Sequence, residues 1–163
     1  MIMNEEREHM DEQTYLDRMQ AAEQVLYRVA CTLLDSEADR RDAMQETALH
    51  AWEKRDTLRQ EQYFQTWAVR IMINVCRTMH RQRRRMTVTE DVGDRPAPQG
   101  DPELRLALDA LSERYRLPLV LHYLEGFSVT EIARTLRMPA GTVKFNLHQA
   151  RKALRVELDG KEA

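Results

Sequence analysis

The segment SVTEIARTLRMPAGTVKFNLHQARKALR (residues 128–155) decides the fold of the C-terminal part of the chain. It begins with Ser-x-x-Glu, a spacing in which the Ser128 hydroxyl and the Glu131 carboxylate each accept a free N–H at a helix start. A short apolar helix is expected to follow, and a turn through residues 137–139 leads to a longer, basic helix. Two helices joined by a tight turn, the second one basic, predict a helix-turn-helix.

The last helix divides into an apolar face and a polar face. At 100° per residue, four side chains fall within about 60° of one another and are expected to face the core: Val143, Leu147, Ala150 and Leu154. The outer face and the two flanks hold Lys144, Phe145, Asn146, His148, Arg151 and Lys152. Between residues 137 and 155 there are five basic side chains and no acidic one. This excess favours contact with phosphate groups.

Phe145 leaves two alternatives open, because its apolar ring is expected to point away from the core. In the first, the ring packs against a neighbouring helix or a partner protein. In the second, it meets thymine methyl groups or sugars in a DNA major groove, where apolar contact distinguishes bases.

Three apolar stripes at three- and four-residue steps predict a helical bundle in the N-terminal half. The stripes cover residues 15–33, 38–52 and 64–85, the last ending in HRQRRR. Ala38 is expected on the inner face of the second helix, Ser36 is expected to cap that helix, and residues 54–62 are expected to form a loop. Strand signals are absent, so the predicted fold class is all-α.

Charge is segregated along the chain, although the formal net charge of the 163 residues is only −2. Residues 1–17 and 87–103 are acidic, residues 70–85 hold six arginines and no acidic residue, and the last helix is basic. Two basic surfaces separated by an acidic connector indicate two contacts with a polyanion.

Two small helical domains joined by an acidic flexible linker are therefore expected. The linker prediction depends on three prolines and two glycines within residues 87–102, among acidic side chains and without an apolar period. The predicted parts are an acidic tail (1–13), a first domain (14–86), the linker (87–101), a second domain (102–157) and a C-terminal tail (158–163). Pro118 is expected to bend its helix or shift the helix start.

Several functional classes are disfavoured. The longest apolar run, residues 117–121, is too short to cross a membrane, and the acidic N-terminus lacks the order of a signal peptide. A cytoplasmic protein without membrane insertion is expected. Cys31 and Cys76 are expected to be small buried side chains and not a disulfide or a zinc site. Without a histidine ligand pair or a glycine-rich phosphate loop, neither catalysis nor a bound metal or cofactor is expected.

The stretch LPLVLHYLEGFSVTEIARTLRMPAGTVKFNLHQARKALR (117–155) resembles region 4 of bacterial RNA polymerase sigma factors of the extracytoplasmic-function (ECF) class. The stretch ADRRDAMQETALHAWEKRDTLRQEQYFQTWAVRIMINVCRTMHRQRRR (38–85) resembles their region 2. The motifs D-x-x-Q-E-T at 42–47 and G-T-V-K at 141–144 are specific in combination. The resemblance covers about residues 14–157 and keeps the family's order.

The resemblance implies a factor that binds core RNA polymerase and directs promoter recognition and opening. It implies contacts to the core polymerase by Asp42, Gln45 and Glu46. For the −10 element of promoter DNA it implies Tyr63, Asn74, Arg77, His80 and Arg81. For the −35 element it implies Thr142, Lys144, Phe145, Asn146, His148, Arg151 and Lys152. It also implies an anti-sigma factor as a partner, and a linker that threads the RNA exit path of the polymerase.

Region 4 departs from the family pattern at Arg137, where a turn glycine is usual, and at Phe145 and Asn146, where a Ser-Arg pair is frequent. Gly141 has two explanations, a close approach of the backbone to DNA or to the preceding helix.

The alternative function is a helix-turn-helix regulator that binds an operator independently of core polymerase and dimerises through its first domain.

Overall fold

The computed structural model describes residues 9–85 and 101–160. The predictions for residues 1–8, for nearly all of the linker (86–100) and for residues 161–163 therefore lie outside the described residues. Every regular element in the two described ranges is helical, which confirms the all-α prediction. The elements are α1 (Glu12–Leu33), α2 (Glu37–Lys54), the 3-10 turns η1 (Arg55–Thr57) and η2 (Glu61–Tyr63), α3 (Phe64–Arg85), α4 (Pro102–Ala110), α5 (Glu113–Tyr123), α6 (Val129–Leu136) and α7 (Ala140–Asp159).

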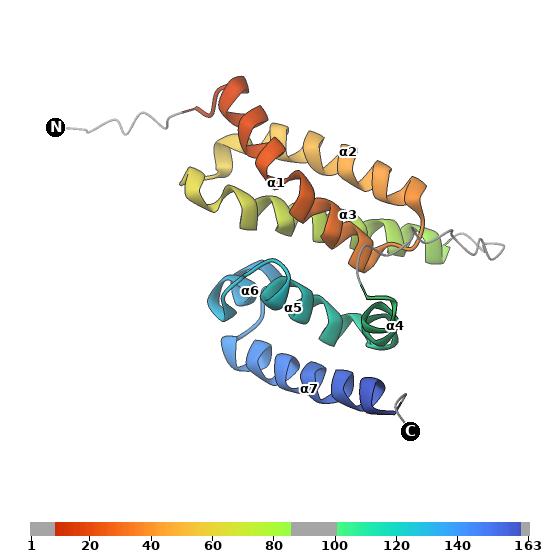
Figure 1. Ribbon diagram of the computed structural model, residues 1–163. Coiled ribbons are helices and arrows are strands. Elements are labelled where there is room, and N and C mark those ends of the chain that lie inside the picture. Colours follow the sequence, from red (N-terminus) through yellow and green to blue (C-terminus); the bar gives the residue numbers. More distant parts are fainter. Residues whose placement is uncertain (1–8, 86–100, 161–163) are drawn as a thin grey trace.

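The helices form two layers, an N-terminal layer of α1–α3 and a C-terminal layer of α4–α7 (Figure 1). α1 packs against α5 and α3 packs against α6, so the layers are in direct contact. α7 lies on the far side of α5 and α6, at the outside of the molecule. The predicted helical units are thus both present and packed on each other.

A continuous apolar core joins the two layers. Seven buried side chains of the C-terminal layer belong to the same cluster as the buried side chains of α1 and α3. Two of them, Val143 and Leu147, lie on α7, and we call the other five the interlayer seam: Leu117, Leu121, Phe127, Ile132 and Leu136. A smaller, separate cluster on the other side of α5 contains Leu111, Leu119 and Ala150. The apolar cores of the two layers are therefore continuous through α5 and α6.

Of the three serines expected to cap helices, Ser36 and Ser128 do so, whereas Ser112 stands at the start of α5 without a side-chain cap hydrogen bond. The Ser128 hydroxyl accepts from the Glu131 N–H at 3.1 Å and the Glu131 carboxylate accepts from the Ser128 N–H at 3.0 Å, which confirms the capping box. Ser36 accepts from the Asp39 N–H at 3.4 Å at the start of α2. α5 begins at Glu113 and runs through Pro118, so the expected shift of its start is not observed.

The turn between α1 and α2 is held by a side chain that the helical pattern did not single out. Arg40 is 1% exposed, and its guanidinium donates to the Leu34 and Asp35 carbonyl oxygens at 3.0 and 3.2 Å. These carbonyls follow the end of α1, where backbone acceptors lack helical partners. Ala38, which was expected to face inward, is exposed. The expectation for Ala38 was wrong because Arg40 fills the inner position at the start of α2.

The N-terminal layer begins earlier than the predicted boundary at residue 14. Met10 is 6% exposed, and its carbonyl accepts from Arg55 Nε at 3.2 Å. Asp11 caps α1 by accepting the Thr14 N–H at 2.7 Å. Met10 and Asp11 therefore contribute to the first helical unit, although Asp11, Glu12 and Gln13 are exposed.

Arg137 ends α6 with left-handed backbone angles, φ 52° and ψ 52°. The Met138 N–H returns to the Ala133 carbonyl at 3.0 Å, as in a Schellman helix end. Burial and the nearby Arg137 charge both lower the pKa of Arg70 on α3, burial having the larger effect. Arg137 thus carries both a backbone strain and a like-charge contact across the layers.

We expect Arg137→Gly to raise the free energy of unfolding by about 1 kcal/mol, because glycine adopts the left-handed conformation without a Cβ clash. Urea denaturation measures the change. Arg137→Ala is the matched control, since it removes the charge and keeps the strain. Equal stabilisation by both variants would show that charge repulsion, and not the backbone, is responsible.

Candidate polymerase and nucleic-acid interfaces

α2 presents an outward face with acidic, amide and apolar side chains. Asp42, Gln45 and Glu46 are all exposed, and their spacing places them on one side of the helix. Leu49 continues this face and is 55% exposed. Leu49 was not among the predicted residues of this face, although its spacing of seven from Asp42 and four from Gln45 places it there. We call these residues the α2 patch.

α3 carries an exposed polar stripe formed by Asn74, Arg77 and Arg81. Their spacing of three and four residues keeps them on one side of the helix. The Arg77 guanidinium lies 3.8 Å from the Glu113 carboxylate at the start of α5, so this stripe reaches the C-terminal layer. Tyr63 precedes α3 and is 45% exposed.

His80 does not belong to this exposed stripe. Its Nε2 lies 2.7 Å from the Leu33 carbonyl oxygen at the end of α1, and the side chain is half-buried. Arg83, one turn further, pairs with Asp39 on α2. The basic end of α3 therefore holds the α1–α2 turn, and the expectation of a DNA-facing His80 does not fit this structure.

α7 exposes the polar face that its sequence predicts. Lys144, Phe145, His148, Arg151 and Lys152 are exposed and Thr142 is partly exposed. Val143, Leu147 and Ala150 are buried and Leu154 is partly buried, as expected for the core face. Within residues 9–85 and 101–160, no carboxylate forms an ion pair with the three basic side chains of this face, Lys144, Arg151 and Lys152. Their charge is therefore available to an external anion.

Phe145 is 51% exposed at the outer surface of α7. Its ring belongs to neither apolar cluster of the described residues, and contact with DNA or with a partner protein stays a prediction. Gly141 lies nearby, and a Cβ added there would meet nothing within 4 Å. The packing of the preceding helix therefore does not require this glycine.

The burial of Asn146 contradicts the prediction that this side chain contacts DNA. Its side chain is 1% exposed, and Nδ2 lies 3.9 Å from the Met138 sulfur atom. Oδ1 is buried and has no hydrogen-bond partner among the described residues. The prediction was wrong because α6 and the turn before α7 cover this flank, which a wheel of α7 alone treats as open.

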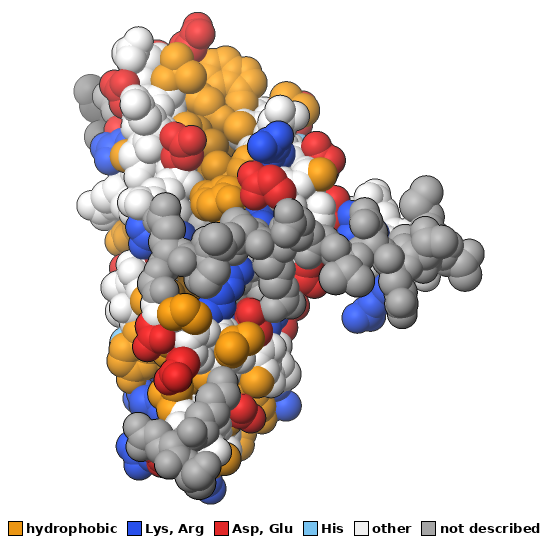
Figure 2. All heavy atoms as spheres, turned by 45° about the vertical axis from the view of Figure 1, so that its right-hand side comes forward, with side chains coloured by type: hydrophobic (Ala, Val, Ile, Leu, Met, Phe, Trp, Pro, Cys, Tyr) orange, Lys and Arg blue, Asp and Glu red, His pale blue; other side chains and the backbone are white. Residues whose placement is uncertain are grey.

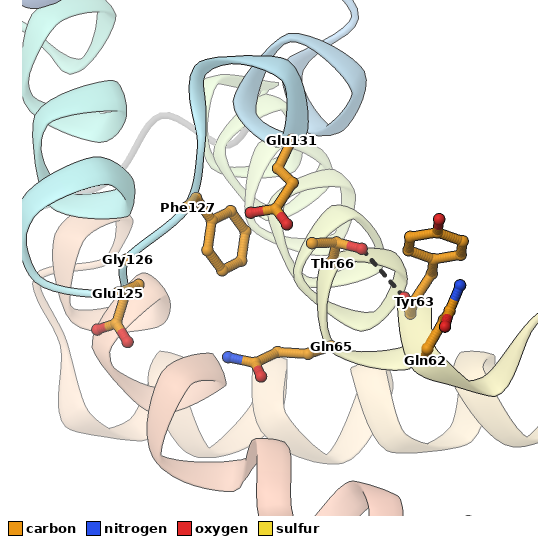
Figure 3. A pocket seen from close by; sticks show the side chains of 8 residues that line it. All are labelled: Gln62, Tyr63, Gln65, Thr66, Glu125, Gly126, Phe127 and Glu131. Atoms are coloured by element: carbon orange, nitrogen blue, oxygen red, sulfur yellow. Dashed lines mark hydrogen bonds between the residues drawn. The ribbon is translucent and has the colours of Figure 1, made fainter.

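A pocket of about 470 Å³ lies where the two layers meet (Figure 3). Gln62, Tyr63, Gln65 and Thr66 line it from the N-terminal layer, and Glu125, Gly126, Phe127 and Glu131 line it from the C-terminal layer. Figure 3 shows Gln65 extending toward the turn that holds Glu125. The start of α3 is thus faced by the α5–α6 turn.

Glu125 is the buried carboxylate of this contact. Its side chain is 2% exposed, and Arg28 on α1 lies 3.2 Å from it and is 40% exposed. Burial raises the pKa of Glu125, and the Arg28 charge opposes that rise without cancelling it.

The surface of the molecule is otherwise mixed in character (Figure 2). Figure 2 shows a group of apolar side chains toward the end formed by the N-terminal layer, with Lys and Arg around the lower edge where the C-terminal layer lies. Among the described residues, no group of three His, Cys, Asp or Glu side chains is arranged to hold a metal ion. None of the described helices combines the length and apolar character that crossing a membrane requires.

Comparison with known proteins places both layers in one family. The Sigma-70 region 2 model matches residues 19–86, and the Sigma-70 region 4 model matches residues 102–154. The ECF RNA polymerase sigma factor SigL of Mycobacterium tuberculosis is 33% identical over 147 residues, which cover 82% of each chain. This chain belongs to the ECF sigma factor family. In this sigma factor, α1–α3 correspond to region 2 and α4–α7 to region 4.

Other relatives agree with this assignment. ECF sigma factor SigE of Mycolicibacterium smegmatis is 33% identical over 80% of this chain, which spans 56% of the length of SigE. Among solved structures, RpoE of Bartonella quintana in complex with the anti-sigma factor NepR is 26% identical, has a TM-score of 0.74, and is matched over 91% of this chain and 96% of RpoE. CnrH in complex with the cytosolic domain of CnrY has a TM-score of 0.71 at 22% identity, over 92% of this chain and 90% of CnrH, and shows the same fold. Members of this family are transcription initiation factors.

We expect removal of Arg28 and removal of the Glu125 charge to have unequal effects on the free energy of unfolding of this sigma factor. Arg28→Ala should lower the free energy of unfolding by about 1–3 kcal/mol, because it leaves a buried carboxylate without its charge partner. Glu125→Gln should change it by less than about 1 kcal/mol, since Arg28 is solvated and the amide carries no charge to desolvate. Urea denaturation at neutral pH compares the two variants.

The same pair predicts a pH dependence. A raised pKa means that the folded protein favours the protonated form of the carboxyl group. The free-energy cost of burying the ionised form therefore disappears as the pH drops through that pKa. The Arg28→Ala loss should therefore shrink as the pH is lowered from neutral toward the ordinary glutamate pKa of 4.5. A Glu125→Gln loss as large as that of Arg28→Ala would instead show that attraction outweighs desolvation in this pair.

Proposed function

We propose that this ECF sigma factor binds core RNA polymerase through the α2 patch and reads promoter DNA through α3 and α7. The observation that carries the proposal is the pairing of two exposed basic helices, one in region 2 and one in region 4, with a separate acidic and apolar face on α2. An operator-binding regulator needs only one of these three surfaces.

The α2 patch has the composition of a protein interface. Leu49 supplies an exposed apolar contact at one end of the patch, and Asp42, Gln45 and Glu46 in the preceding two turns supply hydrogen-bond acceptors and one amide. Interfaces of this kind place apolar contact at the centre and polar groups at the rim. Acidic side chains at the rim suit a basic partner surface. We assign this face to the core polymerase.

We assign the −10 element to the start and the outer stripe of α3. Tyr63 offers a stacking surface for an unpaired base, and Asn74 offers an amide to a base edge or the backbone. Arg77 and Arg81 supply charge for the phosphates. Capture of unpaired bases selects A·T-rich DNA, which unstacks at low cost, so opening needs no nucleotide hydrolysis.

We assign the −35 element to α7. A recognition helix of a helix-turn-helix enters the major groove with its N-terminal residues on the bases. Thr142 and Phe145 lie in the first two turns of α7, and Phe145 is suited to a thymine methyl group. Lys144, Arg151 and Lys152 are suited to the flanking phosphates.

Reading both elements requires the layers to separate. The two elements are about 25 base pairs apart, or about 85 Å at 3.4 Å per pair. α3 and α7 are separated in this structure only by α5 and α6, and packed helices lie about 10 Å apart. The packed form is therefore a form that does not span a promoter. We propose that an anti-sigma factor binds it, as the RpoE–NepR and CnrH–CnrY complexes suggest.

Loss of the α2 patch should weaken polymerase binding and spare binding to duplex DNA. We expect Asp42→Ala and Leu49→Ala each to cost about 1 kcal/mol or more in affinity for core polymerase, roughly fivefold. Glu23→Ala, an exposed acidic position on α1, is the control. Run-off transcription with purified core polymerase tests the whole assignment, and a protein that binds DNA yet never programs the polymerase would contradict it.

Loss of a basic side chain on α7 should reduce the salt dependence of DNA binding. Arg151→Ala should lower the slope of log affinity against log salt by about 1, since one phosphate contact releases about 0.9 counterion. The control is Arg41→Ala, an exposed arginine on α2. Fluorescence anisotropy over a salt series gives both slopes, and an unchanged slope would remove Arg151 from the phosphate contacts.

A further inference from the structure

Tyr123, the last residue of α5, holds the Arg151 side chain of α7. The Arg151 guanidinium donates from Nη1 to the Tyr123 hydroxyl oxygen at 2.7 Å, and the Tyr123 side chain is 54% exposed. We infer that Tyr123 is a positioning residue that fixes Arg151 for contact with a DNA phosphate. The inference rests on the proposed function, in which α7 faces the −35 element.

Arg151 occupies a useful place on the helix. It follows Lys144 by seven residues, so the two side chains point within about 20° of each other and are about 10 Å apart along the axis. Both are exposed, and neither pairs with a carboxylate among the described residues. A phosphate strand that runs along this flank of α7 meets both charges.

The Tyr123 ring is itself held in place. It meets the His122 ring edge-on, with centroids 4.9 Å apart and an interplanar angle of 84°. His122 Nδ1 donates to the Phe127 carbonyl oxygen at 2.8 Å, because a carbonyl only accepts. Phe127 is 4% exposed within the interlayer seam. The orientation of the Tyr123 hydroxyl is thus tied to the buried α5–α6 turn.

This contact orders Arg151 without neutralising it. A guanidinium has five N–H donors, and the tyrosine oxygen takes one of them. The remaining donors and the full positive charge stay available to a phosphate, whereas a carboxylate partner would compete with it. Ordering the side chain before binding reduces the entropy lost on binding.

Arg151 is distinguished in this respect from its neighbours on the same face. Within the described ranges, the Lys144 and Lys152 side chains make no hydrogen bond to the protein. Arg151 is therefore the basic side chain of the outer α7 face that the protein holds in a fixed direction. This is the reason to expect that Tyr123 matters for affinity.

A double-mutant cycle tests the inference. Tyr123→Phe removes the hydroxyl and keeps the ring, and it is combined with Arg151→Ala in the full chain. The probe is a short DNA duplex of mixed sequence, because phosphate contacts are largely independent of sequence. We expect Tyr123→Phe to weaken binding about three- to tenfold when Arg151 is present, the range of one hydrogen bond, and to have no effect in the Arg151→Ala background.

The control is Tyr115→Phe on the same helix. The Tyr115 hydroxyl makes no hydrogen bond among the described residues, so its removal should leave binding unchanged. Urea denaturation confirms that all variants are folded. An equal loss in both backgrounds, no loss, or tighter binding by Tyr123→Phe overturns the inference. If Arg151→Ala itself leaves binding unchanged, the proposed role of Arg151 fails together with the inference about Tyr123. If Arg151→Ala weakens binding and Tyr123→Phe does not, only the role of Tyr123 fails.

Discussion

The apolar seam between the two layers is the constraint on which the rest of the structure depends. Leu117 and Leu121 on α5, Phe127 in the turn and Ile132 on α6 are buried with the core of region 2. The cluster that region 4 keeps for itself is built around Leu111, Leu119 and Ala150. A unit of about sixty residues buries only about 60% of the surface of its unfolded chain. Region 4 therefore gains core from region 2, and its helix-turn-helix is packed so that α7 faces outward.

The charges around this seam limit its strength. Two ion pairs, Arg28–Glu125 and Arg77–Glu113, join the layers. The Glu125 carboxylate is buried, which costs desolvation free energy. The Arg77–Glu113 pair is exposed to solvent, which weakens its attraction. Arg70 and Arg137 bring like charges together across the same boundary. The contact between the layers is thus stabilised by the ion pairs and destabilised by the desolvation of Glu125 and by the repulsion between the two arginines. Such a contact suits two regions that are proposed to separate on a promoter.

Local signals in the sequence predicted the helices, the capping box at Ser128 and the sharp turn at Arg137, because each depends on residues close together in the chain. The misses have a different cause. Arg40, His80 and Asn146 all make contacts with another helix or with the turn that follows one. A helical wheel shows which face is apolar, but it does not show how many sides of a helix are covered. The seam itself was not predicted for the same reason.

The number of basic residues in a helix is therefore a poor measure of its availability to DNA. In α3, Arg77 and Arg83 have carboxylate partners and His80 binds a backbone carbonyl. On the outer face of α7, the basic side chains lack such partners among the described residues, and Arg151 is held by a neutral hydroxyl. In the packed form α7 is thus the more available of the two basic helices. On the proposed function, the −35 contact needs no rearrangement inside the protein, whereas Arg77 reaches the −10 element only after it leaves Glu113.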